Sequence, residues 1–127
     1  MLTREQCVKL RDAGMEQTLK KGDWYYHLDA TETDHPSLTS RGSFRHRKCL
    51  KIPSDRELVE FVVASLKRRF TGGEFSCLSI YHYPDGDVTI AAEIADIDNP
   101  DERVMLKHQP DLDAALYARW EKMTGGK

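Results

Sequence analysis

The sequence lacks long hydrophobic runs and closely spaced cysteines. None of its apolar runs approaches the ~18–20 residues that a helix needs to cross a bilayer. The opening residues, MLTREQCVKL, contain no continuous apolar core of the kind found in a signal peptide. Cys7, Cys49 and Cys77 form an odd, widely spaced set, which is typical of reduced cytosolic thiols. We therefore expect a protein of the bacterial cytoplasm with no membrane partner.

A strong charge of either sign is also missing. The 127 residues carry a formal net charge of −2, so any attraction to phosphate must be local. This length suits one domain with a core of its own, and no internal repeat or linker divides the chain. We expect a single domain over residues 1–127, with a long polar loop at about 30–46 and a loose tail at 124–127.

Common metal-binding and catalytic motifs are absent as well. The five histidines never form H-x-x-x-H, no C-x-x-C occurs, and no glycine-rich loop carries the P-loop lysine. We expect no metal and no cofactor, and we assign no catalytic residue. Cys49 lies among positive charges, which favour a reactive thiolate if the side chain is exposed, but the sequence assigns it no base.

The helix and strand signals that are present predict an α+β fold. Helices are expected at about 3–13, 54–70 and 111–123, where a capping residue precedes apolar residues at helical spacing. Strands are expected at 23–29 and 47–52, and a hairpin turns at Pro84-Asp85-Gly86. With a short strand at 103–108, the order is α-β-β-α-β-β-(β)-α, an antiparallel sheet of about four to five strands with three helices.

Alternation along the hairpin predicts two faces. One face carries Leu78, Ile80, Val88, Ile90 and Ala92. The other carries Phe75, Cys77, Tyr81 and Tyr83. Because both faces bear large side chains, either both are covered or the tyrosine face is a contact surface.

The densest positive charge lies in residues 41–53, RGSFRHRKCLKIP. Arginine binds phosphate through two parallel hydrogen bonds, and aromatic rings stack on bases. The candidate ligand-binding residues are Arg41, Arg45, Arg47, Lys48, Trp24, Tyr26 and Phe44. This set is typical of a site for a nucleotide-type small molecule, with nucleic acid a less favoured ligand.

Other interpretations of the basic stretch remain open. Lysine and arginine also protect an edge strand from pairing with other chains. The stretch could instead pair with the acidic residues at 96–102, within one chain or across a homodimer. A second basic run at 67–69 is interpreted as helix C-terminal capping.

Four segments resemble small phage and prophage accessory proteins. They are LTREQCVKLRDAG at 2–14, WYY at 24–26, CLKIPSDREL at 49–58 and DAALYARW at 113–120. The resemblance implies an origin in a mobile element and interference with host machinery or host defence. We therefore expect a phage-type binding protein that captures a nucleotide-type signal molecule stoichiometrically.

Two alternative functions stay open. The first is an inhibitor that binds a host defence protein through the Tyr81/Tyr83 face or the acidic residues at 96–102. The second is a small enzyme acting on a nucleotide, with Glu93, His82 or Cys49 as participants.

Overall fold

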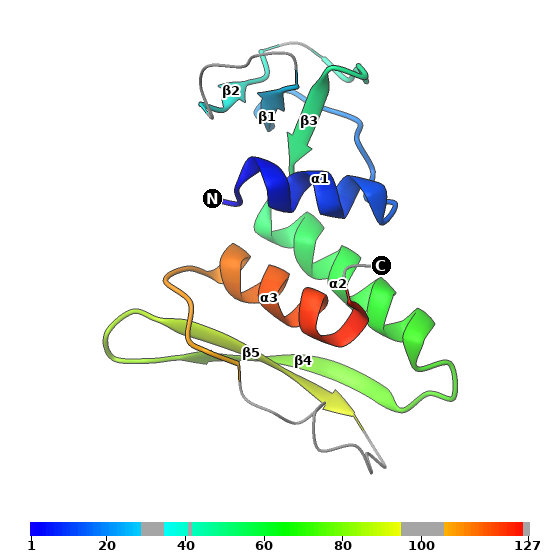
Figure 1. The fold of residues 1–127 in the computed structure, drawn as a ribbon, viewed down its shortest axis with the longest axis vertical. Coiled ribbons are helices and arrows are strands. Elements are labelled where there is room, and N and C mark those ends of the chain that lie inside the picture. Colours follow the sequence, from blue (N-terminus) through cyan, green and yellow to red (C-terminus); the bar gives the residue numbers. More distant parts are fainter. Residues whose placement is uncertain (29–34, 41, 95–105, 126–127) are drawn as a thin grey trace. The chain divides into compact units, whose positions relative to one another are not determined.

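A computed structural model describes residues 1–28, 35–40, 42–94 and 106–125 (Figure 1). The chain forms two compact units, Met1–Ser54 and Asp55–Lys127, here called the first and second units. Each combines helix with antiparallel strands, which confirms the α+β class. The strands of the described residues form one sheet of three and one sheet of two, where the sequence predicted a single sheet of four to five strands. The expectation of one domain stays a prediction.

The first unit opens with helix α1 (Arg4–Asp12). Its predicted capping box is confirmed: the Gln6 N–H donates to the Thr3 hydroxyl at 3.2 Å, and the Thr3 N–H donates to the Gln6 side chain at 2.9 Å. Cys7 and Leu10 form the buried side of the helix. Gly14 follows with a φ of 102°, a conformation that a side chain would disfavour.

The sheet of the first unit has the order β2-β1-β3. Its strands are β1 (Trp24–His27), β2 (Ser37–Leu38) and β3 (Cys49–Ile52), and both pairings are antiparallel. The predicted pairing of β1 with β3 is confirmed. The predicted loop at 30–46 is wrong in part, because it contains β2. A two-residue strand has no periodic pattern by which a sequence could reveal it.

The two faces of this sheet carry different side chains. Tyr26 and Leu50 stand opposite each other and are buried, and the Tyr26 hydroxyl donates to the Leu2 carbonyl at 2.7 Å. Lys51 belongs to the other face and is also buried. Its ammonium group donates to the Thr18 carbonyl at 2.9 Å and lies 3.4 Å from the Asp23 carboxylate. These contacts hold the segment at 15–23 against the sheet.

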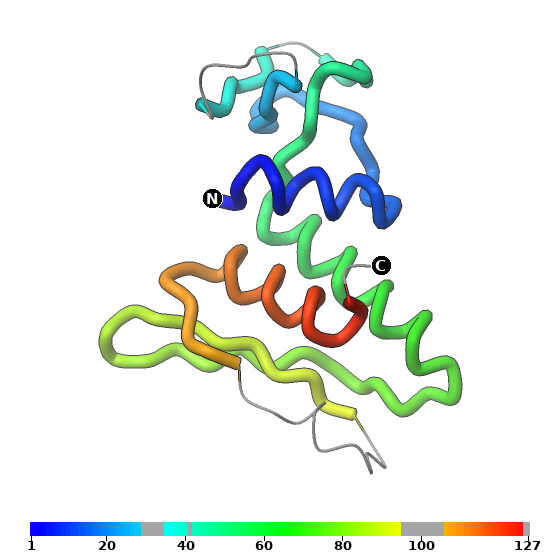
Figure 2. The backbone as a smooth tube through the Cα atoms, in the orientation of Figure 1, coloured from blue at the N-terminus to red at the C-terminus, as the bar shows by residue number. Residues whose placement is uncertain are grey.

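The second unit pairs a hairpin with two helices. It consists of α2 (Asp55–Arg69), β4 (Phe75–His82), β5 (Val88–Ile94) and α3 (Leu112–Thr124). Figures 1 and 2 show both helices on one side of the hairpin. Trp120 is fully buried between Phe61 and Tyr117, with ring centroids 5.8 and 5.5 Å away. The predicted hairpin is confirmed, and Gly86 takes the expected positive φ in its turn.

One predicted hairpin face needs a correction. Phe75 pairs with Ile94 and Cys77 with Glu93, so a β-bulge places an extra residue between Phe75 and Cys77. The extra residue reverses the alternation. Phe75 therefore joins the face of Val88 and is buried, whereas Cys77 is exposed.

The strand predicted at 103–108 falls partly outside the described residues. Its described residues, 106–108, are not in a strand, and Gln109 after them forms an isolated antiparallel bridge with Val88. His108 stacks on Tyr83 with ring centroids 3.7 Å apart. No helix among the described residues is both long and apolar enough to cross a membrane.

Candidate functional site

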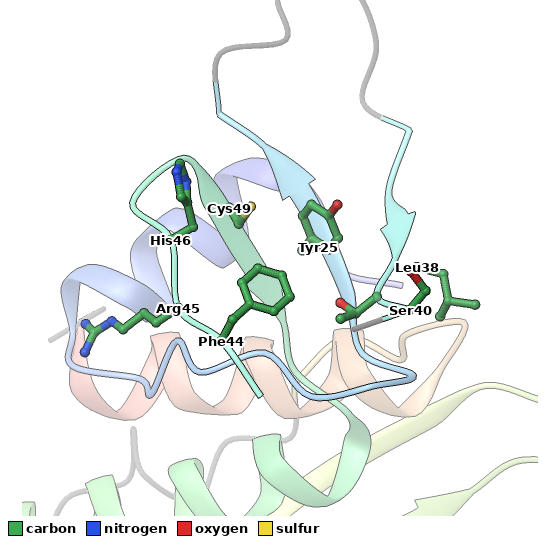
Figure 3. Close-up of a pocket in the computed structure, with 8 residues that line it drawn as sticks. Tyr25, Leu38, Ser40, Phe44, Arg45, His46 and Cys49 are labelled. Atoms are coloured by element: carbon green, nitrogen blue, oxygen red, sulfur yellow. The ribbon is translucent and has the colours of Figure 1, made fainter. Parts of the chain in front are cut away.

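The candidate site is a pocket of about 500 Å³ in the first unit (Figure 3). It is lined by Tyr25, Leu38, Thr39, Ser40, Phe44, Arg45, His46 and Cys49, and we call it the aromatic pocket. Figure 3 shows the Tyr25 and Phe44 rings with the Cys49 sulfur beside them. These three side chains come from β1, from the segment before β3 and from the start of β3.

Strand alternation decides which aromatic residues reach this pocket. Tyr25 occupies the opposite face of β1 from Trp24 and Tyr26, because neighbouring residues of a strand point to opposite sides. Trp24 is 41% exposed but does not line the pocket, and Tyr26 is in the core. The two predicted stacking residues of β1 are therefore replaced by Tyr25. Phe44 lines the pocket as predicted.

A second pocket, of about 450 Å³, adjoins the same segment of chain. It is lined by Arg11, Gln17, Arg45, His46, Arg47 and Cys49, and we call it the basic pocket. Both pockets are lined by Arg45, His46 and Cys49, so the chain at 45–49 forms part of the wall of each. In Figure 3 the Arg45 guanidinium extends away from the Phe44 and Tyr25 rings.

The remaining predicted ligand-binding residues are Lys48 and Arg41. Lys48 is exposed and lines neither pocket. Arg41 lies outside the described residues. Arg11 was not predicted, since its position on a helix face gives no sign that the chain at 45–49 packs beside it.

A turn before β3 sets the direction of these side chains. The Cys49 N–H donates to the His46 carbonyl at 3.0 Å, and the Lys48 N–H donates to His46 Nδ1 at 3.1 Å. Because Nδ1 accepts this bond, the neutral imidazole carries its proton on Nε2. In an extended chain, Arg45 and Arg47 would point the same way. Both arginines do line the basic pocket, although the chain between them bends.

The backbone of Phe44 is hydrogen-bonded to that of Leu19. Its N–H donates to the Leu19 carbonyl at 2.9 Å, and the Leu19 N–H donates to the Phe44 carbonyl at 2.7 Å. Leu19 is fully buried, so this bridge fixes the backbone of Phe44 to the core of the first unit.

One lining residue of the aromatic pocket has a buried hydroxyl without a partner among the described residues. Thr39 is only 4% exposed, and its Oγ1 makes no hydrogen bond within the described part of the chain. Leaving a buried hydroxyl without a partner costs about 1–3 kcal/mol. Groups of this kind are often satisfied by a ligand or by ordered water.

One acidic side chain lies close to the arginines. Glu16 accepts hydrogen bonds from the Thr18 hydroxyl at 2.7 Å and from the Gln17 and Thr18 N–H groups at 3.0 Å each. The bond from the Thr18 hydroxyl is the largest influence that lowers the pKa of Glu16, and the charge of Arg45 adds to it. The carboxylate therefore stays ionised and offsets part of the positive charge of Arg45.

This lowered pKa predicts an acid-sensitive contribution to the stability of the first unit. A carboxyl whose pKa is lower in the folded state stabilises above its unfolded pKa and loses that effect as pH falls through the folded value. We expect Glu16→Gln to lower the melting temperature at pH 7 and to match the wild type more closely as pH falls below ~4.3. Glu60→Gln, at an exposed carboxylate on α2, is the control. If the melting temperature of Glu16→Gln differs from that of the wild type by the same amount from pH 7 to pH 3, this role is contradicted.

The residues named for the enzyme alternative are divided between the two units. Glu93 is exposed on the outer hairpin face, where it accepts a hydrogen bond from Ser79 at 3.1 Å. His82 pairs with Val88 on the opposite face. Cys49 belongs to the first unit. Within the described ranges, no cluster of three His, Cys, Asp or Glu side chains is arranged to hold a metal ion.

The tyrosines named for protein binding differ in exposure. Tyr81 is 45% exposed on the outer face of β4. Tyr83 is half-buried against His108. The acidic residues at 96–102 lie outside the described residues.

The second basic run lines a smaller pocket in the second unit. This pocket, of about 330 Å³, is formed by Ser65, Arg68, Arg69 and Thr124 at the C-terminal ends of α2 and α3. The Ser65 and Thr124 hydroxyls donate to carbonyls of their own helices at 2.9 and 2.7 Å, so neither offers a donor to an anion. This geometry agrees with the capping interpretation.

Comparison of the chain with protein-family models, curated proteins and solved structures finds no match. The geometry of the aromatic and basic pockets is therefore the basis for inferring a function.

Proposed function

We propose that the first unit binds a nucleotide-type small molecule by stoichiometric capture. The observation that carries this proposal is the pair of pockets on either side of the chain at 45–49. One offers aromatic rings, the other offers guanidinium groups, and they share Arg45, His46 and Cys49. A nucleotide has the same two parts, an aromatic base and a charged phosphate group.

The aromatic pocket supplies the contacts that a base needs. Tyr25 and Phe44 both line it, and stacking of one base on an aromatic side chain contributes about 1–3 kcal/mol. Thr39 lines the same pocket with its hydroxyl oxygen buried. A volume of about 500 Å³ is within the range of small-molecule sites.

The basic pocket supplies the contacts that phosphate needs. Arg11, Arg45 and Arg47 line it, and a guanidinium can donate two parallel hydrogen bonds to a phosphate. Among the described residues, two carboxylates lie near these three arginines. Asp12 pairs with Arg11 at 3.1 Å, and Glu16 lies near Arg45.

The test is a thermal-shift panel on the purified protein. It compares nucleoside triphosphates, NAD and cyclic dinucleotides with the matching nucleosides and with inorganic triphosphate. A ligand that binds only the folded state adds ~2.7 kcal/mol of stability at a hundred times its Kd. We expect at least one nucleotide to raise the melting temperature more than its nucleoside or triphosphate alone, because only the nucleotide fills both pockets.

The same samples distinguish capture from turnover. Capture predicts one nucleotide per chain and unchanged nucleotide after incubation, as seen by chromatography. Release of product at substoichiometric protein would favour the enzyme alternative. If no nucleotide shifts the melting temperature, the pockets are not a nucleotide site.

The biological setting of this proposal is interference with host defence, as implied by the resemblance to phage accessory proteins. Sequestering a signal nucleotide would block a defence system without any contact with its proteins. An inhibitor that binds a host protein remains the second candidate, and the exposed Tyr81 on the outer hairpin face favours it.

A further inference from the structure

The three cysteines of the chain have different surroundings. Cys7 is buried, Cys77 is exposed, and Cys49 is intermediate. Cys77 stands directly opposite the carboxylate residue Glu93 in the hairpin register. Cys49 lines the basic pocket together with three arginines and stands directly opposite His27.

Positive charge beside a thiol favours the thiolate, which is the nucleophile in disulfide exchange. Arg45 and Arg47 are close in sequence to Cys49, and Arg11 joins them in the pocket. His27 is the cross-strand neighbour of Cys49, so the β-carbons of these two residues lie about 5 Å apart. Cys77 stands opposite Glu93 instead, whose negative charge repels an anionic disulfide.

We propose that Cys49 is a modification site for small anionic disulfides, of which glutathione disulfide is the common cellular type. The Cys49 thiolate attacks one sulfur of the disulfide after its proton passes to water or to His27. A new bond forms between Cys49 Sγ and that sulfur, and the original sulfur–sulfur bond breaks. The other sulfur leaves as a thiolate with the electron pair, so Cys49 is oxidised and the leaving thiol is reduced.

The pockets also give the attached group a place to lie. Its carboxylates meet the arginines of the basic pocket. Because Cys49 lines both pockets, a group attached there occupies space that a ligand would need. The inference thus adds a means of regulation to the same site, although the reaction itself does not require nucleotide binding.

The experiment compares two disulfides of opposite charge on two variants. In Cys77→Ser the accessible cysteine is Cys49, and in Cys49→Ser it is Cys77. Buried Cys7 is not expected to react in the folded protein. The probes are 5,5′-dithiobis(2-nitrobenzoate), which is anionic, and cystamine, which is cationic. Modification is followed by intact mass, and peptide mapping identifies the cysteine.

For each cysteine we take the rate of modification by the anionic disulfide divided by the rate with the cationic one. At low salt we expect this ratio to be at least about tenfold larger for Cys49 than for Cys77. The difference should shrink at ~1 M salt, where the Debye length is about 3 Å. Arg47→Gln in the Cys77→Ser background should lower the ratio for Cys49. His27→Gln should slow both probes alike.

Equal ratios for the two cysteines would overturn the proposal, as would a Cys49 that reacts no faster than Cys7. Circular dichroism of each variant confirms that the protein is folded. The readout is the mass of a modified thiol, so its result does not depend on the outcome of the nucleotide panel. Glutathione disulfide is then tested on the wild type, where a mixed disulfide at Cys49 is expected.

Discussion

The double variant Arg45→Gln/Arg47→Gln is expected to lose nucleotide binding while keeping its fold. Both side chains are exposed and line the basic pocket, so their removal leaves the core intact. A hydrogen bond to a charged group contributes about 1.5–3 kcal/mol, which is roughly tenfold to more than a hundredfold in affinity for each arginine. Together, the two changes should weaken binding at least a hundredfold, as measured by calorimetry with the best nucleotide of the panel.

The second unit offers a matched control for this experiment. Lys67→Gln/Arg68→Gln removes the same amount of charge from exposed positions near the end of α2. We expect this variant to bind as the wild type does. Equal losses in both variants would mean that overall charge, not the basic pocket, governs affinity. Unchanged binding in Arg45→Gln/Arg47→Gln would remove these arginines from the site.

Lys51→Met is expected to give the largest loss of stability in the first unit. The Lys51 side chain is 3% exposed, donates to the Thr18 carbonyl and pairs with the Asp23 carboxylate. Methionine fills similar space but leaves that carboxylate without its cation, with the Lys20 N–H still donating to it at 2.8 Å. Removal of one partner from a buried ion pair costs about 3–5 kcal/mol. Because Asp23 is 22% exposed, the lower end of that range is expected.

The two tryptophans allow the first unit to be followed by itself. Trp24 belongs to the first unit and Trp120 to the second, and the chain has no other. In a Trp120→Phe background, Trp24 fluorescence reports urea unfolding of the first unit. Lys21→Met, at an exposed lysine of the first unit, is the control and should change stability by less than about 0.5 kcal/mol. A Lys51→Met loss no larger than that of Lys21→Met would contradict the structural role of the ion pair.

Local signals predicted most of the helices and strands. The Thr3 capping box and the turn at Pro84-Asp85-Gly86 depend only on neighbouring residues, so the sequence reveals them directly. Features that depend on distant partners were missed. The extra residue before Cys77 changes the face of Phe75, and no composition marks such a bulge in advance.

The candidate site was predicted in part for the same reason. The sequence indicated Phe44, Arg45 and Arg47, which are close together along the chain. It selected Trp24 and Tyr26 over Tyr25 because the aromatic cluster in β1 does not show which face is covered. The structure resolves that choice: burial of Tyr26 places Tyr25 on the other side.

Self-association stays a prediction. The sequence motivated it by the opposite charges of the basic stretch and the residues at 96–102, and the latter lie outside the described residues. Sedimentation of the wild type at two salt concentrations tests it, because a dimer held by these charges should weaken as salt rises.

The most direct test of the proposed site is nuclear magnetic resonance of the ¹⁵N-labelled protein titrated with the best nucleotide. Binding across the two pockets predicts that the largest amide shifts fall at Tyr25, Thr39, Phe44, Arg45 and Cys49. These positions belong to three separate segments of the first unit, which only the folded pocket brings together. Shifts confined to the second unit, or scattered weakly over all basic residues, would contradict the account.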